Sequence, residues 1–214
     1  MRQHKTQKVI VLVLLLLVSL PVPATAGIPS DQVRQTADKV LLILQDPRLK
    51  AADKKKERRD QLRQVISARF DFIEMAKRSL GQHWQRRSAE EQRQFVQLFT
   101  DLLERSYADQ IESFNGKKVL YGRENQDRDH AEVDTRVVTN KGEEFSMNYK
   151  LYSAGRDWKV YDVVIENISL VNNYRSQFNR ILANSSFEEF LRKLQEKNFD
   201  ATGKSGRQTG GARS

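Results

Sequence analysis

Few side chains in this sequence are suited to catalysis or to metal binding. The 214 residues contain no cysteine and three histidines, which excludes a disulfide framework, a Cys-ligated metal site and a cysteine nucleophile. His83 follows an expected helix end, and His130 closes the polar segment 122–130, so both are expected to be structural or exposed. The sequence has no nucleophile elbow, phosphate-binding loop, HExxH motif or dinucleotide-binding glycine pattern. The residues therefore predict neither a catalytic nor a metal site.

Two carboxylates, Asp162 and Glu166, lie on or beside an apolar strand and could act as an acid or a base. We favour a different interpretation, in which a buried carboxylate anchors a turn, and we extend it to Asp71, which lies between two phenylalanines. An enzyme would need a second polar group in the same cavity, and the sequence identifies none. We therefore expect no catalysis, and an enzyme that uses Asp162 or Glu166 is the alternative.

The N-terminus has the pattern of a secretory signal peptide. Three basic residues precede an unbroken run of ten aliphatic residues from Val9 to Val18. This run is short for a membrane anchor, because a span needs about 20 residues. The small residues Ala24-Thr25-Ala26 then predict cleavage before Gly27. We therefore expect residues 1–26 to be a signal peptide and the mature protein to be periplasmic.

The net charge of +9 at first suggests a nucleic acid or an anionic surface as partner. Three positive charges lie in the expected signal peptide. Three more lie in the basic, glycine-rich tail 200–214, which is expected to be disordered. The folded part, residues 27–200, is left near +3, and the expected domain covers residues 27–199 of it. Its basic run Lys54–Arg59 has no interleaved aromatic residue and is typical of a solvated helix face, so we expect no nucleic-acid binding.

The periodicity of apolar residues predicts a single α+β domain with a mostly antiparallel sheet of about four strands. Apolar spacing is helical before residue 115, alternates from 117 to 168, and is helical again after 170. Helices are expected over residues 30–46, 53–80, 88–115, 170–182 and 186–194, and strands over 118–121, 132–139, 145–151 and 158–165.

Local signals refine these elements. Ser30 is expected to cap the first helix, and Ser88 and Ser186 each begin a capping box that is completed three residues later by a glutamate. A change of phase near Tyr161 and Asp162 predicts a β-bulge in the last long strand.

The segment Trp158–Val163 (WKVYDV), with Ile165–Phe178 (IENISLVNNYRSQF) after it, resembles the signature of the MlaC family, also called the toluene-tolerance auxiliary proteins. The segment from Phe70 to Trp84 is similar to another part of the family pattern, and the resemblance extends from about residue 30 to 197. Asn167 replaces the usual glycine of the family. Because Asn tolerates positive φ best after Gly, a left-handed turn is expected there.

The resemblance implies a periplasmic carrier of phospholipid without a cofactor. Family members have a twisted antiparallel, NTF2-like sheet wrapped by helices around an apolar lipid pocket. The implied partners are phospholipid, an inner-membrane lipid-transport ABC complex with its ring subunit, and an outer-membrane lipoprotein–porin complex; the carrier is expected to be a monomer. Some relatives are associated with other lipids such as hopanoids, so the cargo stays open. A structural or adaptor subunit with a solid core is a further alternative.

Twelve apolar residues on the inward faces of the expected elements are candidates to line the pocket, and about half are expected to touch lipid. They are Phe99, Leu103, Tyr107, Val133, Met147, Tyr149, Leu151, Trp158, Val163, Ile165, Tyr174 and Phe178. The headgroup is expected to stay exposed, because burying an unpaired phosphate is costly. Arg175 is expected to hold its helix to Asp162 or to a neighbouring carbonyl, with contact to the lipid phosphate as the alternative.

Overall fold

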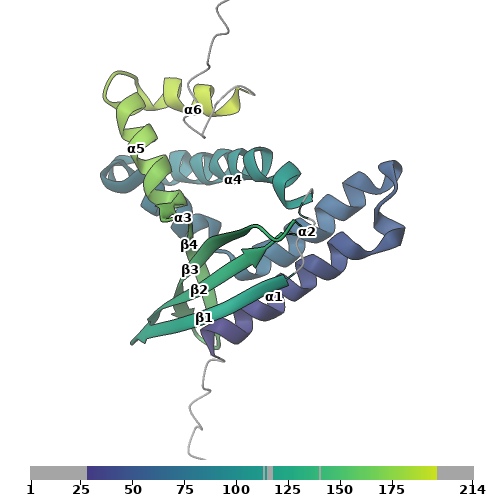
Figure 1. Cartoon of the computed structure of the whole chain (residues 1–214). Helices are drawn as coiled ribbons and strands as arrows, with labels where there is room; N and C mark the ends of the chain where they lie inside the picture. The colour runs from purple at the N-terminus through teal and green to yellow at the C-terminus, as the bar shows by residue number, and fades with distance from the viewer. Residues whose placement is uncertain (1–27, 113, 115–117, 140, 197–214) are drawn as a thin grey trace, which may run out of the picture.

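A five-stranded antiparallel sheet forms the base of the structure (Figure 1). The computed structural model describes residues 28–112, 114, 118–139 and 141–196. The expected signal peptide 1–26 and tail 200–214 lie outside these described residues and stay predictions. The strands neighbour one another in chain order: β1 Lys118–Asp127, β2 His130–Val138, β3 Glu144–Ala154, β4 Asp157–Ile165 and β5 Ile168–Ser169.

β1 is longer than the sequence indicated. The strand expected over 118–121 is confirmed, but its expected end and the polar loop 122–130 are wrong, because β1 continues to Asp127 with a shift of register between Tyr121 and Glu124. β1 lies at the edge of the sheet, and β2 supplies its backbone hydrogen bonds. An edge strand can therefore be polar on both faces and give no alternating apolar signal.

The expected bulge in β4 is confirmed. Lys150 pairs with Asp162 and Leu151 pairs with Val160, so Tyr161 is an extra residue on β4. On a regular strand, two residues that are three apart point to opposite faces of the sheet. Because the bulge adds one residue between them, Val160 and Val163 are both buried.

A tight turn after β4 adds a short fifth strand to the four that were expected. Glu166 and Asn167 both have positive φ, 47° and 65°, which confirms the left-handed turn predicted at Asn167. Two such residues form the kind of hairpin turn whose twist matches that of the flanking strands. Ile168 can therefore pair back with Ile165 in β5.

The helices lie to one side of the sheet and above one of its ends in Figure 1. The described α-helices are α1 Pro29–Gln45, α2 Lys55–Arg69, α3 Phe72–Leu80, α4 Ala89–Glu112, α5 Leu170–Leu182 and α6 Phe187–Gln195. The expected capping boxes of α4 and α6 are confirmed. The expected cap at Ser30 is wrong. Proline suits the first turn of a helix, so α1 begins at Pro29, and the Ser30 amide donates to Glu124 instead.

The single helix expected over 53–80 is wrong, because the chain breaks into α2 and α3 at Phe70 and Asp71. The Asp71 amide donates to the Val160 carbonyl of β4 at 2.8 Å, and Phe70 forms a β-bridge with Val160. The Asp71 side chain then accepts from the Glu74 amide at 2.9 Å and caps α3. The expected structural role of Asp71 is therefore confirmed.

The hydrophobic interior forms two clusters. The helical cluster joins α3, α4, α5 and α6, and its aromatic centre contains Phe95, Phe99, Tyr174, Phe178 and Phe190. The sheet cluster joins α1 to the inner face of the sheet and consists of Val33, Ala131, Val133, Leu151, Trp158, Val160 and Val163. Phe70, at the α2–α3 break, packs against both clusters.

Polar contacts attach α5 to the sheet and to α3. Asp162, 4% exposed, accepts from the Ser169 hydroxyl at 2.6 Å and from the Val171 amide at 3.0 Å. Ser169 in turn caps α5. The Arg175 Nε donates to the carbonyl of Arg78 at 2.8 Å, so Arg175 binds a neighbouring carbonyl, as expected. Asp162 is the buried anchor that the sequence predicted.

Asp162→Asn should destabilise the fold by about 2 kcal/mol, because an amide replaces one of two charged acceptors in a buried position. Urea unfolding followed by circular dichroism measures this change. Asp134→Asn is the matched control, since Asp134 is 33% exposed in its side chain and lies 3.6 Å from Arg123; we expect it to change stability by less than about 0.5 kcal/mol. Equal effects of the two substitutions would contradict the anchoring role.

Candidate functional site

The inner face of the sheet becomes less covered along its length. Three cross-strand rows describe it: a first row of Ala131, Leu151 and Val160, a second of Val133, Tyr149 and Val163, and a third of Thr135, Met147 and Ile165. The first row is buried throughout, whereas Tyr149 of the second row and both apolar members of the third are partly exposed. The apolar strip is therefore sealed at its first row and open toward its third.

Tyrosines border the open part of this strip. The Tyr149 hydroxyl donates to the Met147 sulfur at 3.2 Å, and burial raises the pKa of Tyr149 well above its ordinary value. Burial, helped by the charge of Asp38, raises the pKa of Tyr121 to about 12. These phenols are neutral at physiological pH, so this wall is uncharged while still offering polar hydroxyls.

The candidates on α4 and α5 fall into two environments. Phe99, Tyr174 and Phe178 are 0% exposed and pack against one another in edge-to-face and tilted arrangements, with ring centroids 5.3 to 6.0 Å apart. Leu103 is buried in the helical cluster, and Tyr107 is half-buried at its margin. The first three therefore fill the core, while Tyr107 retains accessible apolar surface.

The twelve candidates thus divide between the two clusters and do not form one lining. Five lie in or against the helical cluster: Phe99, Leu103, Tyr107, Tyr174 and Phe178. Seven lie in or against the sheet cluster: Val133, Met147, Tyr149, Leu151, Trp158, Val163 and Ile165. Sequence reasoning missed Phe70, which contacts both clusters and whose ring lies 6.5 Å from that of Tyr149. The one sequence signal for Phe70 was that it begins the segment 70–84, which is similar to the family pattern. Because a single helix was expected over 53–80, Phe70 was expected to lie within a helix and not at a break.

The candidate acid–base residues are engaged in structural contacts. Both oxygens of Asp162 accept hydrogen bonds from the start of α5. Glu166, in an exposed turn, accepts from the amide and the hydroxyl of Ser146. Asp71 accepts from Tyr152, and this hydrogen bond, more than burial, raises the pKa of Tyr152 to about 12. These partners are turn, strand and cap groups, which indicates structural roles.

The histidines also have local partners. His83 lies 3.1 Å from the Asn179 side chain, and His130 lies 2.9 Å from Asp129, both at exposed sites. Among the described residues, no three His, Asp or Glu side chains are grouped so that they could hold a metal ion.

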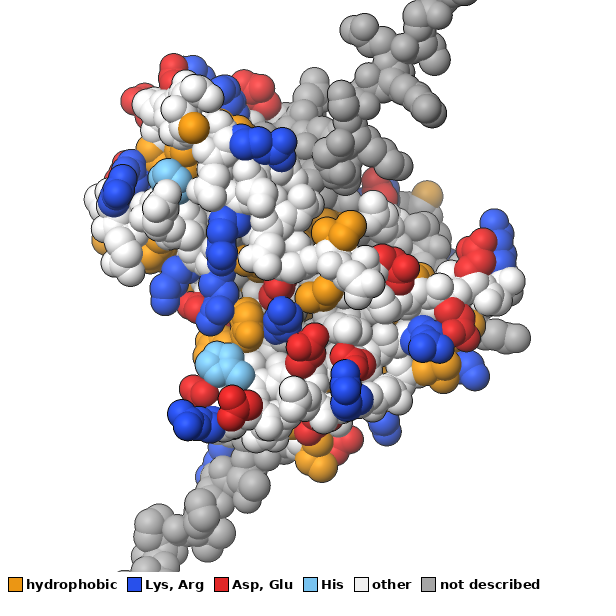
Figure 2. Space-filling view, turned by 60° about the vertical axis from the view of Figure 1, so that its left-hand side comes forward, with side chains coloured by type: hydrophobic (Ala, Val, Ile, Leu, Met, Phe, Trp, Pro, Cys, Tyr) orange, Lys and Arg blue, Asp and Glu red, His pale blue; other side chains and the backbone are white. Residues whose placement is uncertain are grey.

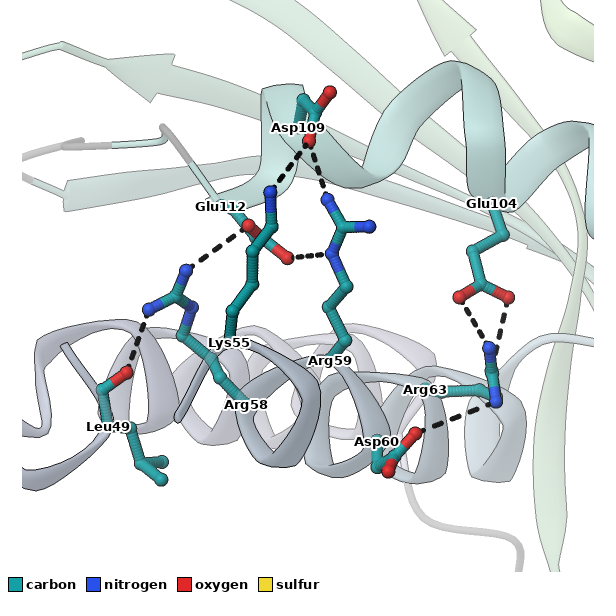
Figure 3. Close-up of polar contacts among 9 residues, drawn as sticks. All are labelled: Leu49, Lys55, Arg58, Arg59, Asp60, Arg63, Glu104, Asp109 and Glu112. Atoms are coloured by element: carbon teal, nitrogen blue, oxygen red, sulfur yellow. Dashed lines mark hydrogen bonds and ion pairs between the residues drawn. The ribbon is translucent and has the colours of Figure 1, made fainter. Parts of the chain in front are cut away.

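A group of ion pairs, which we call the α2–α4 clasp, connects two helices on one flank of the molecule (Figure 3). Its cations lie on α2 and its anions on α4. Arg59 lies 2.6 Å from Asp109 and also donates to Glu112; Arg58 lies 3.2 Å from Glu112. The other members are Lys55, 3.9 Å from Asp109, and Arg63, whose Nε donates to Glu104 at 3.1 Å. The run Lys54–Arg59, expected to be a solvated face, thus supplies cross-helix contacts.

A hollow of about 320 Å³ lies beside the clasp. Its lining is mainly charged: Arg59, Asp101, Glu104, Arg105, Ala108 and Asp109. Acyl chains need apolar walls, so this hollow is not the expected lipid pocket.

Charges of both signs are mixed on the face shown in Figure 2. Basic and acidic side chains alternate there, and the described part of this face has no broad positive patch of the kind that binds nucleic acid. Within the described ranges, no helix is both long and apolar enough to cross a membrane.

Comparisons with known proteins agree with this architecture. The family model MlaC, described as MlaC protein, matches residues 34–196. The intermembrane phospholipid transport system binding protein MlaC of Haemophilus influenzae is 22% identical over an alignment of 173 residues, which covers 78% of this chain and 81% of the relative. The toluene tolerance protein ttg2D of Pseudomonas putida is 24% identical over an alignment of 168 residues, which covers 77% of this chain and 78% of the relative.

A solved structure also matches. It is the phospholipid-binding protein from Ralstonia solanacearum in complex with a phospholipid, which is 28% identical with a TM-score of 0.71 and covers 79% of this chain and 96% of that chain. The match supports the α+β architecture, while the expected NTF2-like relationship stays a prediction. Because the family model spans most of the chain and includes the WKVYDV and NYRSQF segments, this chain belongs to the MlaC family.

Proposed function

We propose that this protein is a phospholipid-binding transport carrier. The observation that carries the proposal is the match to a protein of the same architecture that was solved with a phospholipid. The match covers 96% of the chain of that protein. Two long acyl chains represent roughly 20 to 25 kcal/mol of transfer free energy, at about 0.8 kcal/mol per CH₂. Free phospholipid therefore leaves a membrane slowly, and a carrier with an apolar site lowers this cost.

We propose that the acyl chains lie on the open part of the inner sheet face. Met147, Tyr149 and Ile165 support this placement, because they are apolar, contiguous and only partly covered. Phe70 borders the same region, because it packs against both clusters and its ring lies 6.5 Å from that of Tyr149. Phe99, Tyr174 and Phe178 are assigned to core packing, since they are already fully buried against other rings.

The setting and the partners are part of the same proposal. The N-terminal sequence pattern supports export, so the carrier acts in the periplasm after cleavage before Gly27. It shuttles lipid, as a monomer, between an outer-membrane lipoprotein–porin complex and an inner-membrane ABC complex with its ring subunit. The name of the Haemophilus influenzae relative, intermembrane phospholipid transport system binding protein, supports this placement. The NTF2-like enzyme has no comparable support, because Asp162 and Glu166 are occupied by structural hydrogen bonds.

Lipid extraction tests the function directly. Protein comprising residues 27–214, purified from the periplasm of a bacterial host, should release phospholipid into organic solvent, identified by mass spectrometry. The same protein, stripped of lipid, should take up labelled phospholipid from vesicles. A clean extract together with no uptake would contradict the proposal, and a hopanoid or other lipid in place of phospholipid would correct the cargo.

A matched pair of isoleucine substitutions tests the site. Ile165→Asp should reduce phospholipid uptake by about tenfold or more, because a carboxylate on the apolar strip would have to be desolvated by the acyl chains. Ile168→Asp is the control: Ile168 is the β-partner of Ile165 but is 63% exposed, so uptake should be unchanged. Circular dichroism checks that both variants fold. Normal uptake by folded Ile165→Asp protein would remove this residue from the site.

A further inference from the structure

The end of the helical hairpin formed by α1 and α2 is apolar but not buried. We call residues 39–57, which comprise the last turns of α1, the connection and the first residues of α2, the hairpin tip. Five consecutive aliphatic residues lie in it, from Val40 to Leu44, and none of them is buried. The buried residues of α1, Pro29, Gln32 and Val33, all lie at its other end. Packing among the described residues therefore covers the less apolar half of α1 and leaves the more apolar half partly exposed.

Leu42 lies on the side of α1 that faces away from the sheet. It follows Val33, which packs in the sheet cluster, by about two and a half helical turns, so the two side chains point in opposite directions. The neighbours of Leu42 at helical spacing are exposed and polar: Gln35, Asp38, Lys39 and Gln45. Leu42 interrupts this polar stripe and is 68% exposed. A lipid chain on the inner sheet face would lie on the opposite side of α1 and would not cover Leu42.

Basic side chains accompany the apolar residues of the hairpin tip. The segment has six basic and three acidic residues, which give a net charge of +3. All six basic residues are exposed: Lys39, Arg48, Lys50, Lys54, Lys55 and Lys56. The whole folded part, residues 27–200, is also near +3, so the remainder of it is near neutral. Positive charge is thus concentrated next to the exposed aliphatic residues.

The hairpin tip projects from the molecule. α1 and α2 pack against each other, and Figure 1 shows the end of their hairpin extending beyond the sheet. Two short 3-10 turns, Pro47–Leu49 and Ala52–Lys54, close the hairpin. Asp46 fixes the start of the first turn, because its side chain accepts from the Arg48 amide at 2.9 Å. A projecting end held in this way meets a flat surface before the rest of the molecule does.

The composition of the hairpin tip distinguishes a bilayer from a protein as its partner. Protein interfaces are enriched in aromatic residues and depleted in lysine, whereas the hairpin tip has no aromatic residue and five lysines. A second copy of this chain is disfavoured further, because two hairpin tips of equal charge repel each other. Aliphatic residues beside lysines are the combination that binds the interface of a membrane with anionic lipids.

We propose that the hairpin tip docks on the surface of a bilayer that contains anionic lipid. Leu42 and its aliphatic neighbours enter the boundary between headgroups and acyl chains, while the basic residues stay at the level of the anionic headgroups. Docking goes beyond the proposed lipid carriage, since it names where the protein meets a membrane and requires no lipid bound in the carrier.

Co-sedimentation with sucrose-loaded vesicles tests docking. Protein comprising residues 27–214 should bind vesicles that contain phosphatidylglycerol at least about tenfold more tightly than vesicles of phosphatidylcholine alone. Salt at about 0.5 M should weaken this binding, because it screens exposed charges. The basic residues of the segment 200–214 are the same in every variant below, so differences between variants report the hairpin tip.

Two exposed aliphatic residues provide a matched pair of variants. Leu42→Glu should weaken binding to the anionic vesicles by about tenfold, because it removes apolar burial and adds a negative charge. Ile73→Glu on α3 is the control: Ile73 is 62% exposed, and the same substitution outside the hairpin tip should change binding by less than about twofold. Circular dichroism checks that both variants fold.

A second pair of variants tests the charge. Arg48→Gln with Lys56→Gln removes two cations whose side chains are 89% and 90% exposed, and should weaken binding by about tenfold. Arg93→Gln with Arg123→Gln removes two cations on α4 and β1, with side chains 74% and 82% exposed, and should leave binding close to that of the wild type.

A fluorescent label reports insertion directly. The chain has no cysteine, so Leu42→Cys and Ile73→Cys can each carry a single NBD fluorophore, whose emission shifts to the blue in an apolar environment. Anionic vesicles should shift the emission of the label at position 42 and leave that at position 73 unchanged. The absence of a shift at position 42 would overturn insertion of the hairpin tip.

The outcomes separate docking from lipid carriage. No binding to anionic vesicles, or equal losses in Leu42→Glu and Ile73→Glu, would overturn docking even if the protein takes up lipid normally. Binding to vesicles by a protein that takes up no lipid would overturn the carrier function alone. A dimer in solution that Leu42→Glu dissociates would assign the hairpin tip to a second copy of this chain and overturn docking.

Discussion

A lipid carrier has to keep an apolar surface available without letting its own side chains collapse onto it. Here the division of the interior into two clusters meets that constraint. The aromatic rings of the helical cluster pack against one another, and the side chains of Phe99, Tyr174 and Phe178 are fully buried. The first row of the sheet face is sealed by packing that includes Val33 of α1. Between these closed regions the third row, with Met147 and Ile165, stays accessible. Hydrophobic stabilisation is thus concentrated away from the surface that we propose for the cargo.

Polar contacts position the parts that apolar packing leaves separate. Asp162 fixes the start of α5 to β4, and Arg175 joins α5 to α3. Arg69 has the corresponding role on the other side, since it donates to the Trp158 carbonyl at 2.6 Å and to Gln32 of α1. Directional bonds specify where an element lies, while apolar burial is tolerant of small displacements. This combination gives a defined frame around a site that must accept flexible chains.

Much of this frame could be predicted from sequence, because local signals coincide with tertiary structure. The phase change at Tyr161, the turn at Asn167 and the two capping boxes each depend on neighbours a few residues away. The break at Phe70 could not be found in this way: the stripe of Leu62, Ile66, Phe70 and Ile73 keeps a helical period, and the competing hydrogen bond comes from distant Val160. Polar β1 and the clasp arginines were missed for the same reason, since their partners lie on other elements. Within the candidate site, periodicity identified inward faces, but which residues meet rings and which meet open space depends on packing between elements.

The position of Phe70 has a consequence for variation among sequences. A residue that packs in one cluster can be exchanged for another of similar volume, because its neighbours adjust together. The ring of Phe70 lies 6.2 Å from that of Phe72 and 6.5 Å from that of Tyr149, and its backbone is held by β4. A smaller side chain would leave a void against both clusters, and a larger one would force them apart. Fewer residue types should therefore be tolerated at position 70 than at the fully buried phenylalanines of the helical cluster.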